Sequence, residues 1–250
     1  MANYQDQSSI IQNSNEELQE ITRFLQRRED PANPKTILIG GWAVHSYNPW
    51  YGSIDIDLIT NSKSQKSLIE HLVSTRGFVR ARNLDDTKRV EKKVEDGKYI
   101  IIDFGNREQE DPFEGQTSHL TYDILDGQTE LKPIGGGLFF PVPKRTILLI
   151  FKMKAAWDRN YRIGHDESHD TEWEKGKLRK DRADILALLD PVTGGRDIDL
   201  SILGQKMEEY RFLTQCFDEI ITDVDAIGFY GRLPEDDVKV LIERLKELIG

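Results

Sequence analysis

The sequence contains a single cysteine, Cys216, among its 250 residues. An intrachain disulfide is therefore impossible, and a zinc site built from a pair or cluster of cysteines is excluded. No apolar run reaches the length that a helix needs to span a bilayer. The N-terminal segment lacks a basic stretch followed by an apolar one, which is the pattern of a secretory signal. We therefore expect a cytoplasmic protein with no membrane partner.

Positive charge is also in short supply, with 34 basic and 44 acidic side chains and a net charge of −10. This balance argues against non-specific binding to long nucleic acids, which depends on many phosphate contacts, but it leaves room for a local basic groove. Two catalytic patterns are missing as well. No Ser-His-Asp set stands out, and Gly97-Lys98 is not preceded by the glycine pattern of a P-loop.

Apolar periodicity predicts a helix, then a mixed α/β region, then a helical tail. We expect helices at 8–28, 42–48, 64–77, 142–162, 177–190, 199–222 and 234–250. We expect strands at 36–41, 53–60, 78–83, 89–97 and 98–106, with two or three short ones in 120–143. The fold class is therefore α+β, with a mixed sheet and flanking helices in residues 1–145 and a helical domain in 146–250.

The segment "SIDIDLIT", residues 53–60, alternates apolar and polar residues and is typical of a strand. Alternation places Asp55 and Asp57 side by side on one face, while Ile54, Ile56 and Leu58 point to the other. Two neighbouring carboxylates repel each other unless a cation lies between them. Hard oxygen ligands at this spacing suit Mg²⁺, which proteins often hold with one or two carboxylates and substrate phosphates.

Gly40 and Gly41 follow an apolar strand and precede a short helix. Glycines at such a turn let backbone N–H groups approach an anion, and the start of the helix adds a positive dipole end. Either signal is weak by itself. An anion cradle followed by a paired-carboxylate metal site predicts a site for a nucleoside triphosphate.

Asp103 ends the apolar segment "KYIII" on the last expected strand of this region. An acid there can be a third metal ligand or the general base for an attacking hydroxyl. It can also be a turn-initiating residue before Gly105. We favour the catalytic interpretation because of the acid pair that precedes it.

These residues resemble the nucleotidyltransferase superfamily, whose fold is related to DNA polymerase β. The family pattern is Gly-Gly or Gly-Ser after a strand, a spacer, Asp-x-Asp on the next strand and a later acid. Gly40-Gly41, the spacer 42–54, Asp55-Ile56-Asp57 and Asp103 match it. The segment "GGWAV" is similar to antibiotic nucleotidyltransferases. One departure is "WYGSI" before the acids, where many members carry a basic residue.

The second half looks closer to the AbiEii-like branch, which includes toxins of toxin–antitoxin systems. That branch has a helix with Lys, Ala and Arg and a later Lys-Asp-x-x-Asp. The matching residues here are Lys152, Ala155, Arg159, Lys180, Asp181 and Asp184. Both Lys152 and Lys154 could supply the family's lysine. We favour Lys152, because on a helix it shares a face with Ala156 and Arg159, whereas Lys154 shares another with Asp158.

The resemblance implies a transferase that uses Mg²⁺, with Mn²⁺ as the alternative, and a nucleoside triphosphate such as ATP. It implies metal ligands at Asp55, Asp57 and Asp103, with Lys152 completing the catalytic set. The implied nucleotide-binding residues are Gly40, Gly41, Lys152, Arg159 and Asp181. The acceptor is a tRNA, a protein or a small molecule, and a toxin would have an antitoxin partner.

Three alternatives stay open. The chain could be a nucleotide-binding or interaction module that keeps the fold without catalysis. The segment "HDESHD", residues 165–170, could bind a metal but is more typical of an acidic loop. The aromatic residues at 42, 47, 50 and 51 could stack on a nucleobase or close the core beneath the site.

Overall fold

A computed structural model describes residues 8–81, 89–94 and 97–250. The protein is α+β, as the sequence predicts, and its chain divides into two compact units. The first unit comprises Met1–Gln109 and Tyr122–Pro143, and the second comprises Glu110–Thr121 and Lys144–Gly250. Parts of two predicted strands lie outside the described residues, namely 82–83 of the strand at 78–83 and 95–96 of the strand at 89–97.

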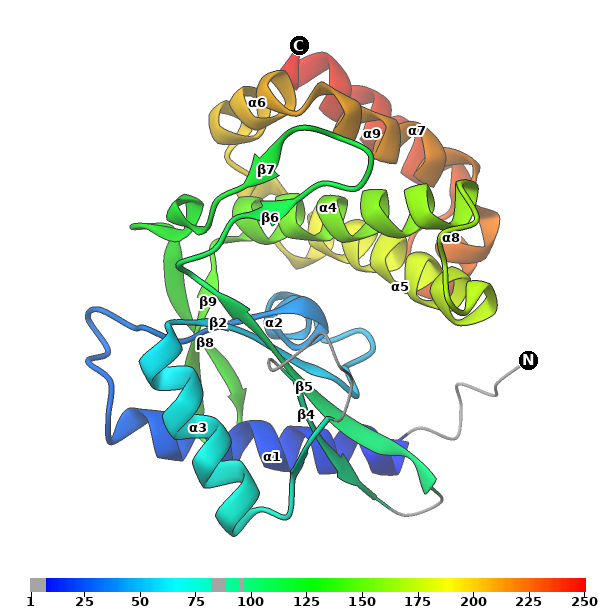
Figure 1. The fold of residues 1–250 in the computed structure, drawn as a ribbon. Coiled ribbons are helices and arrows are strands. Elements are labelled where there is room, and N and C mark those ends of the chain that lie inside the picture. The colour runs from blue at the N-terminus through cyan, green and yellow to red at the C-terminus, as the bar shows by residue number, and fades with distance from the viewer. Residues whose placement is uncertain (1–7, 82–88, 95–96) are drawn as a thin grey trace. The chain divides into compact units, whose positions relative to one another are not determined.

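The first unit contains a mixed five-stranded sheet with the strand order β1-β2-β5-β4-β3. Its strands are β1 (Ile37–Ile39), β2 (Ile56–Thr60), β3 (Val79–Arg80), β4 (Arg89–Lys93) and β5 (Tyr99–Asn106). Only β2 and β5 run parallel, and the other neighbours are antiparallel. This mixed sheet confirms the predicted sheet type and places two of the predicted acids on adjacent strands (Figure 1).

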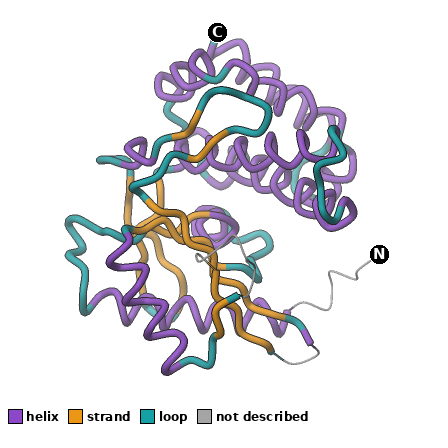
Figure 2. The backbone as a smooth tube through the Cα atoms, viewed as in Figure 1, coloured by secondary structure: helices purple, strands orange, loops and turns teal. Residues whose placement is uncertain are grey.

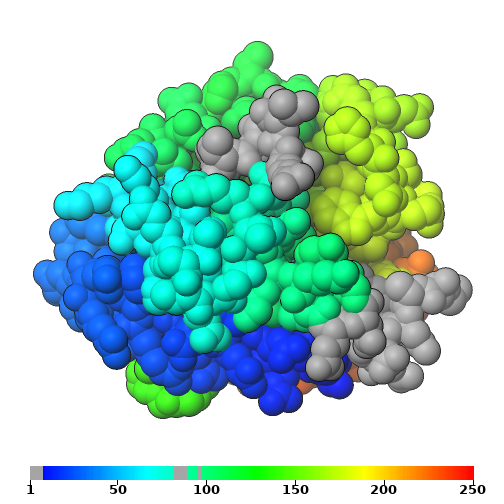
Figure 3. Space-filling view, turned by 60° about the horizontal axis from the view of Figure 1, so that its bottom comes forward, coloured from blue at the N-terminus to red at the C-terminus, as the bar shows by residue number. Residues whose placement is uncertain are grey.

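Three helices belong to this unit: α1 (Ser8–Gln26), α2 (Gly40–Tyr47) and α3 (Ser62–Thr75). Figure 3 shows α1, α3 and the β4–β5 hairpin together on one face of the unit. The carboxylate of Glu17 on α1, which is 4% exposed, joins these elements. It accepts two hydrogen bonds of 3.0 Å from Arg76, directly after α3, and one of 2.7 Å from Lys92 on β4.

The first unit is completed by a short 3-10 turn, η3 (Tyr122–Leu125), and by a hairpin of β8 (Thr129–Gly135) and β9 (Leu138–Pro143). Gly135, Gly136 and Gly137 all have positive φ and form the turn between these strands, as the sequence predicts. β9 contacts β1, so the hairpin extends the core of the sheet.

The second unit is mainly helical (Figure 2). Its α-helices are α4 (Arg145–Gly164), α5 (Thr171–Leu189), α6 (Leu200–Glu209), α7 (Gln215–Thr222), α8 (Val224–Tyr230) and α9 (Glu235–Ile249). Short 3-10 turns connect them, namely η4 (Pro191–Thr193), η5 (Gly195–Asp197) and η6 (Arg211–Thr214). The inserted segment 110–121 adds a small hairpin of β6 (Asp111–Pro112) and β7 (His119–Leu120). Among the described residues, no helix combines the length and apolar character needed to cross a membrane.

Three predicted boundaries are wrong. β2 begins at Ile56, so Asp55 precedes the strand instead of lying on it. The helix expected at 177–190 begins earlier, at Thr171, because the side chain of Asp170 caps α5 by accepting a 3.0 Å hydrogen bond from the N–H of Trp173. The expected helix at 199–222 is interrupted after Glu209, where Tyr210 leaves helical geometry and its buried ring packs against Phe113.

Candidate functional site

The centre of the candidate site is a row of four residues across the sheet of the first unit. Asp57 on β2 is the register partner of Asp103 on the parallel strand β5. Ile39 on β1 flanks Asp57 on one side, and Arg89 on β4 flanks Asp103 on the other. Side chains of register partners leave the same face of a sheet, so the two carboxylates are neighbours on one face.

Gly40 holds the carboxylate of Asp57 against the main chain. It follows Ile39 directly, begins α2 and has a φ of 65°. A Cβ atom built on Gly40 would lie 1.8 Å from Oδ2 of Asp57, so no side chain fits at this position. Gly41 is buried in the first turn of the same helix. The structure thus brings Gly40 and Asp57, two of the predicted site residues, into contact.

Asp103 is engaged by Arg89. Its carboxylate accepts hydrogen bonds of 2.6 Å from Nε and 3.2 Å from Nη2 of this arginine. Both side chains are a little over one third exposed, so this pair contributes little stability and can open. The sequence analysis did not identify Arg89 as a site residue. The correct register between β4 and β5 would have identified it, because that register places Arg89 beside Asp103.

The acids of this row have the donor chemistry of a magnesium site but do not form a closed one. Among the described residues, no group of three or more His, Cys, Asp or Glu side chains is arranged to hold a metal ion. Asp55 and Asp57 are both half-buried, are separated by one residue and supply hard carboxylate oxygens. Asp103 has both oxygens hydrogen-bonded to Arg89, which draws this carboxylate towards β4.

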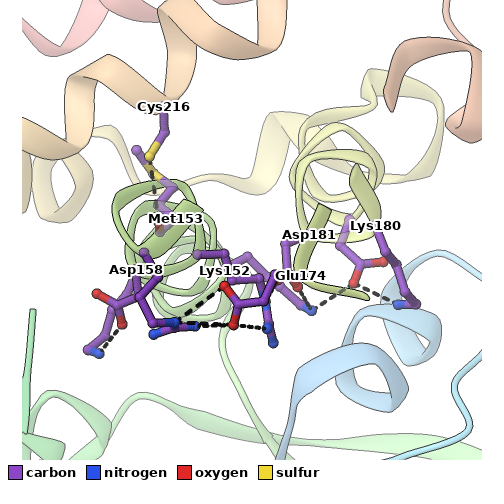
Figure 4. A network of polar contacts seen from close by, with 11 residues as sticks. Lys152, Met153, Asp158, Glu174, Lys180, Asp181 and Cys216 are labelled. Carbon is purple, nitrogen blue, oxygen red and sulfur yellow. Dashed lines mark hydrogen bonds and ion pairs between the residues drawn. The ribbon is translucent and has the colours of Figure 1, made fainter. Parts of the chain in front are cut away.

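The predicted residues of the second unit lie in a buried ion-pair network between α4 and α5 (Figure 4). Nζ of Lys152 is 2.9 Å from Oδ1 of Asp181 and 2.7 Å from Oδ2 of Asp184. Nε of Arg159 donates to Oδ2 of Asp181 at 2.9 Å, and Lys180 donates to Asp184 at 2.9 Å. Lys152 and Arg159 thus share one helix face, as predicted, and that face meets α5.

Lys152 and Asp181 stay charged in this network although both are buried. Burial opposes ionisation of both Lys152 and Asp181, but their mutual attraction outweighs it. The pKa of Lys152 is raised above its ordinary value by the two carboxylates. The pKa of Asp181 is lowered by Lys152 and Arg159. The network is therefore a charged clamp between two helices over the whole physiological pH range.

Lys154 faces a different set of partners. Its Nζ lies 2.6 Å from Asp158 and 3.0 Å from Asp111, and it stands over the ring of Phe113. Burial is the main cause of a raised pKa at Asp158, and Lys154 counteracts it. Both candidate lysines are thus 8% exposed and ion-paired within the second unit, Lys152 towards α5 and Lys154 towards the inserted hairpin.

The remaining candidates have ordinary structural surroundings. Trp42 is 4% exposed and donates from Nε1 to Ser14 at 3.0 Å, which favours its interpretation as a core residue. His165 stacks on Tyr161 with ring centroids 3.8 Å apart, in the segment that follows α4. Burial raises the pKa of the Cys216 thiol to about 12, so it stays protonated at neutral pH.

No known protein family and no curated protein matches this chain when it is compared with them. The evidence for a function therefore comes from the residues of this chain and their geometry.

Proposed function

We propose that the protein is a nucleotidyltransferase, which moves a nucleoside monophosphate from a nucleoside triphosphate to an acceptor and releases pyrophosphate. Its catalytic centre is the row around Asp57 in the first unit, with the nucleotidyltransferase core formed by the mixed sheet and α2. Asp55 and Asp57 hold the metal, Asp103 orients or deprotonates the acceptor, and the backbone of Gly40 and Gly41 receives the triphosphate.

The observation that carries this proposal is the contact between Gly40 and Asp57. Because Gly40 has no side chain, the carboxylate of Asp57 lies beside the first residue of α2, and the first N–H groups of a helix have no partner within the helix. A magnesium ion held by Asp55 and Asp57 would need a phosphate-binding turn nearby, because proteins often hold Mg²⁺ with one or two carboxylates together with substrate phosphates. A turn that served only to connect β1 with α2 would not require an aspartate of β2 at the Cβ position of Gly40.

Mg²⁺, or Mn²⁺ in its place, would be held by Asp55 and Asp57 and would neutralise charge on the phosphates when bound. The chain's own contribution is to hold these carboxylates on a rigid strand and to aim Asp103 from the neighbouring one. Release of Asp103 from Arg89 frees a base for the acceptor hydroxyl and leaves a guanidinium next to the developing negative charge.

The pairing of Arg89 with Asp103 also favours a second candidate function. A module that binds nucleotide without transferring it needs no free base, and in this structure both oxygens of Asp103 are engaged by the arginine. The two functions are separated by product. A transferase releases pyrophosphate in the presence of an acceptor, whereas a binding module retains intact triphosphate.

The acceptor follows only from the family resemblance, which offers a tRNA, a protein or a small molecule. A role as the toxin of a toxin–antitoxin pair belongs to the same resemblance. We propose that Lys152, Arg159 and Asp181 contribute to nucleotide binding through the stability of the helical unit, because their charges already satisfy one another.

The test is incubation of the protein with each α-labelled nucleoside triphosphate, Mg²⁺ and a cell extract, followed by identification of the labelled molecule. Asp57→Asn should reduce transfer to background while leaving the far-UV circular dichroism and melting temperature of the fold unchanged. Asp126→Asn is a matched control, because Asp126 is an exposed acid of the same unit that pairs with Arg107. Full transfer by Asp57→Asn would rule out the proposed metal site.

A further inference from the structure

Only one face of the helix α9 in the second unit is used in the core. Val238, Ile242 and Leu245 are at most 7% exposed and anchor the helix. A second stripe, Asp237–Leu241–Arg244–Leu248, follows the i, i+4, i+7, i+11 spacing of a helix–helix seam, with Val240 beside it. Val240 is 64% exposed and Leu248 is 55% exposed. This stripe therefore has no partner in the described part of the unit.

The stripe forms one wall of an apolar groove with a volume of about 730 Å³. The other wall comes from the segment after α5 and from the start of α6, through Pro191, Ile198 and Leu200, and Leu233 closes one end. Large exposed apolar surfaces of this kind mark association sites on proteins.

The order of charged and apolar residues along the stripe makes it complementary to an antiparallel copy of itself. Asp237 and Arg244 lie equally far along the chain from the Val240–Leu241 peptide bond, and so do Leu233 and Leu248. A two-fold axis through that bond would bring α9 against a copy of itself, running antiparallel. Val240 would then face Leu241 of the copy next to the axis, Asp237 would face Arg244 of the copy, and Leu248 would face Leu233. A two-fold interface requires this reciprocity.

The charged residues that line the groove also favour a second copy of α9 as the partner that fills it. Within the described residues, neither Asp237 nor Arg244 has an ion-pair partner within 4.0 Å, and neither has Arg196, which also lines the groove. The first turn of α9 carries Glu235, Asp236 and Asp237. An antiparallel copy sets this acidic end against the half that carries Arg244, and it also opposes the two helix dipoles favourably.

We propose that the groove is filled by a second copy of this chain, with the two α9 helices packed antiparallel about a two-fold axis at Val240–Leu241. The interface is independent of the row around Asp57, which lies in the other unit.

The test is the mass of the full-length protein in solution, measured by sedimentation equilibrium from about 1 to 200 μM, a range that covers moderate dimer affinities. The wild-type chain should approach twice the 28.8 kDa of one copy. Val240→Glu should keep it monomeric, because each copy would bury a carboxylate against Leu241 of the other copy, close to the axis. Val224→Glu is the matched control, since Val224 is 57% exposed on α8 and outside the groove.

A charge exchange tests the register. Asp237→Arg and Arg244→Asp should each weaken the dimer roughly tenfold or more, because like charges then face each other twice. The double variant should regain wild-type association. The proposal is overturned by a wild-type chain that stays monomeric throughout, which would leave the groove to a different partner. It is equally overturned by a dimer that Val240→Glu leaves intact, or by a double variant that stays as weak as the single ones.

Discussion

Gly40 is the residue at which the candidate site is most easily tested. Gly40→Ala would push a methyl group into the space held by Oδ2 of Asp57, so the carboxylate must move. A shift of about 1 Å in a catalytic group costs on the order of 100-fold in rate. We expect Gly40→Ala to lower nucleotide transfer by about this factor, measured as initial rate of pyrophosphate release.

Gly127→Ala controls for backbone strain in this experiment. Gly127 has a φ of 68°, close to the 65° of Gly40, but a Cβ atom there would meet nothing within 4 Å. Gly127→Ala should lose about 1–2 kcal/mol of stability, because alanine is strained at positive φ, and Gly40→Ala should lose more, because the Asp57 carboxylate must also move. Equal rates for the two variants would show that the contact of Gly40 with Asp57 has no part in the site.

Gly40 and Asp57 could be chosen as candidates from the sequence because each lies in a recognisable local pattern. A glycine pair after a short strand and an acid among apolar residues are visible without knowledge of the fold. The contact of Arg89 with Asp103 could not be predicted in the same way. A turn centred on Asp96-Gly97 would pair Arg89 with Phe104, whereas the structure pairs it with Asp103. A register shift of one residue moves every side chain to the opposite face.

At the scale of helices, the ion-pair network between α4 and α5 makes a prediction about stability. Lys152→Ala would leave Asp181 and Asp184 buried, at 6% and 1% exposure, without their shared cation. Removing one partner of a buried pair costs about 3–5 kcal/mol. Lys175→Ala is the control. Lys175 lies on α5, the helix that carries Asp181, and forms an exposed ion pair with Glu172. Loss of this pair should cost about 0.5 kcal/mol or less. Urea unfolding measures both.

The pH dependence of unfolding gives the same network a second signature. The pKa of Asp181 is lower in the folded protein than in the unfolded chain, so its contribution is complete above the unfolded pKa of about 3.9 and is lost as pH falls further. The pKa of Lys152 is raised, so its contribution is complete below about 10.4 and is lost at higher pH. We expect Lys152→Ala to abolish the alkaline loss. A variant as stable as Lys175→Ala, with an unchanged profile, would contradict the clamp.

Helix boundaries show which signals a sequence carries at this scale. The apolar spacing of α1, α4 and α9 predicts each of these helices to within a few residues. The start of α5 is mispredicted because its first two turns are polar and only the cap at Asp170 reveals them. The break after α6 has no local mark at all. It depends on the packing of Tyr210 against a ring from the inserted hairpin.

At the scale of the whole molecule, the chain interleaves its two units. It leaves the first unit after Gln109, returns at Tyr122 and leaves again after Pro143. The inserted segment is fixed to the helical unit by Phe113, which is 1% exposed and lies 4.9 Å from the ring of Tyr210 and 5.1 Å from that of Phe212. The sequence does not reveal this arrangement, because the chain on both sides of the inserted segment, up to Gln109 and from Tyr122, belongs to the first unit.

Phe113→Ala should therefore destabilise the helices and not the strands that flank it in sequence. Emptying a buried phenylalanine site costs about 3–5 kcal/mol, and the loss should appear as faster amide hydrogen exchange in α4 and α7. Exchange in β2 and β5 should stay at the wild-type rate. Phe139→Ala removes a ring of the same size that is 50% exposed on β9, and it should leave both units protected. Faster exchange in β5 with unchanged α4 would mean that the inserted hairpin belongs to the sheet, and the division of the chain at Gln109 would then be wrong.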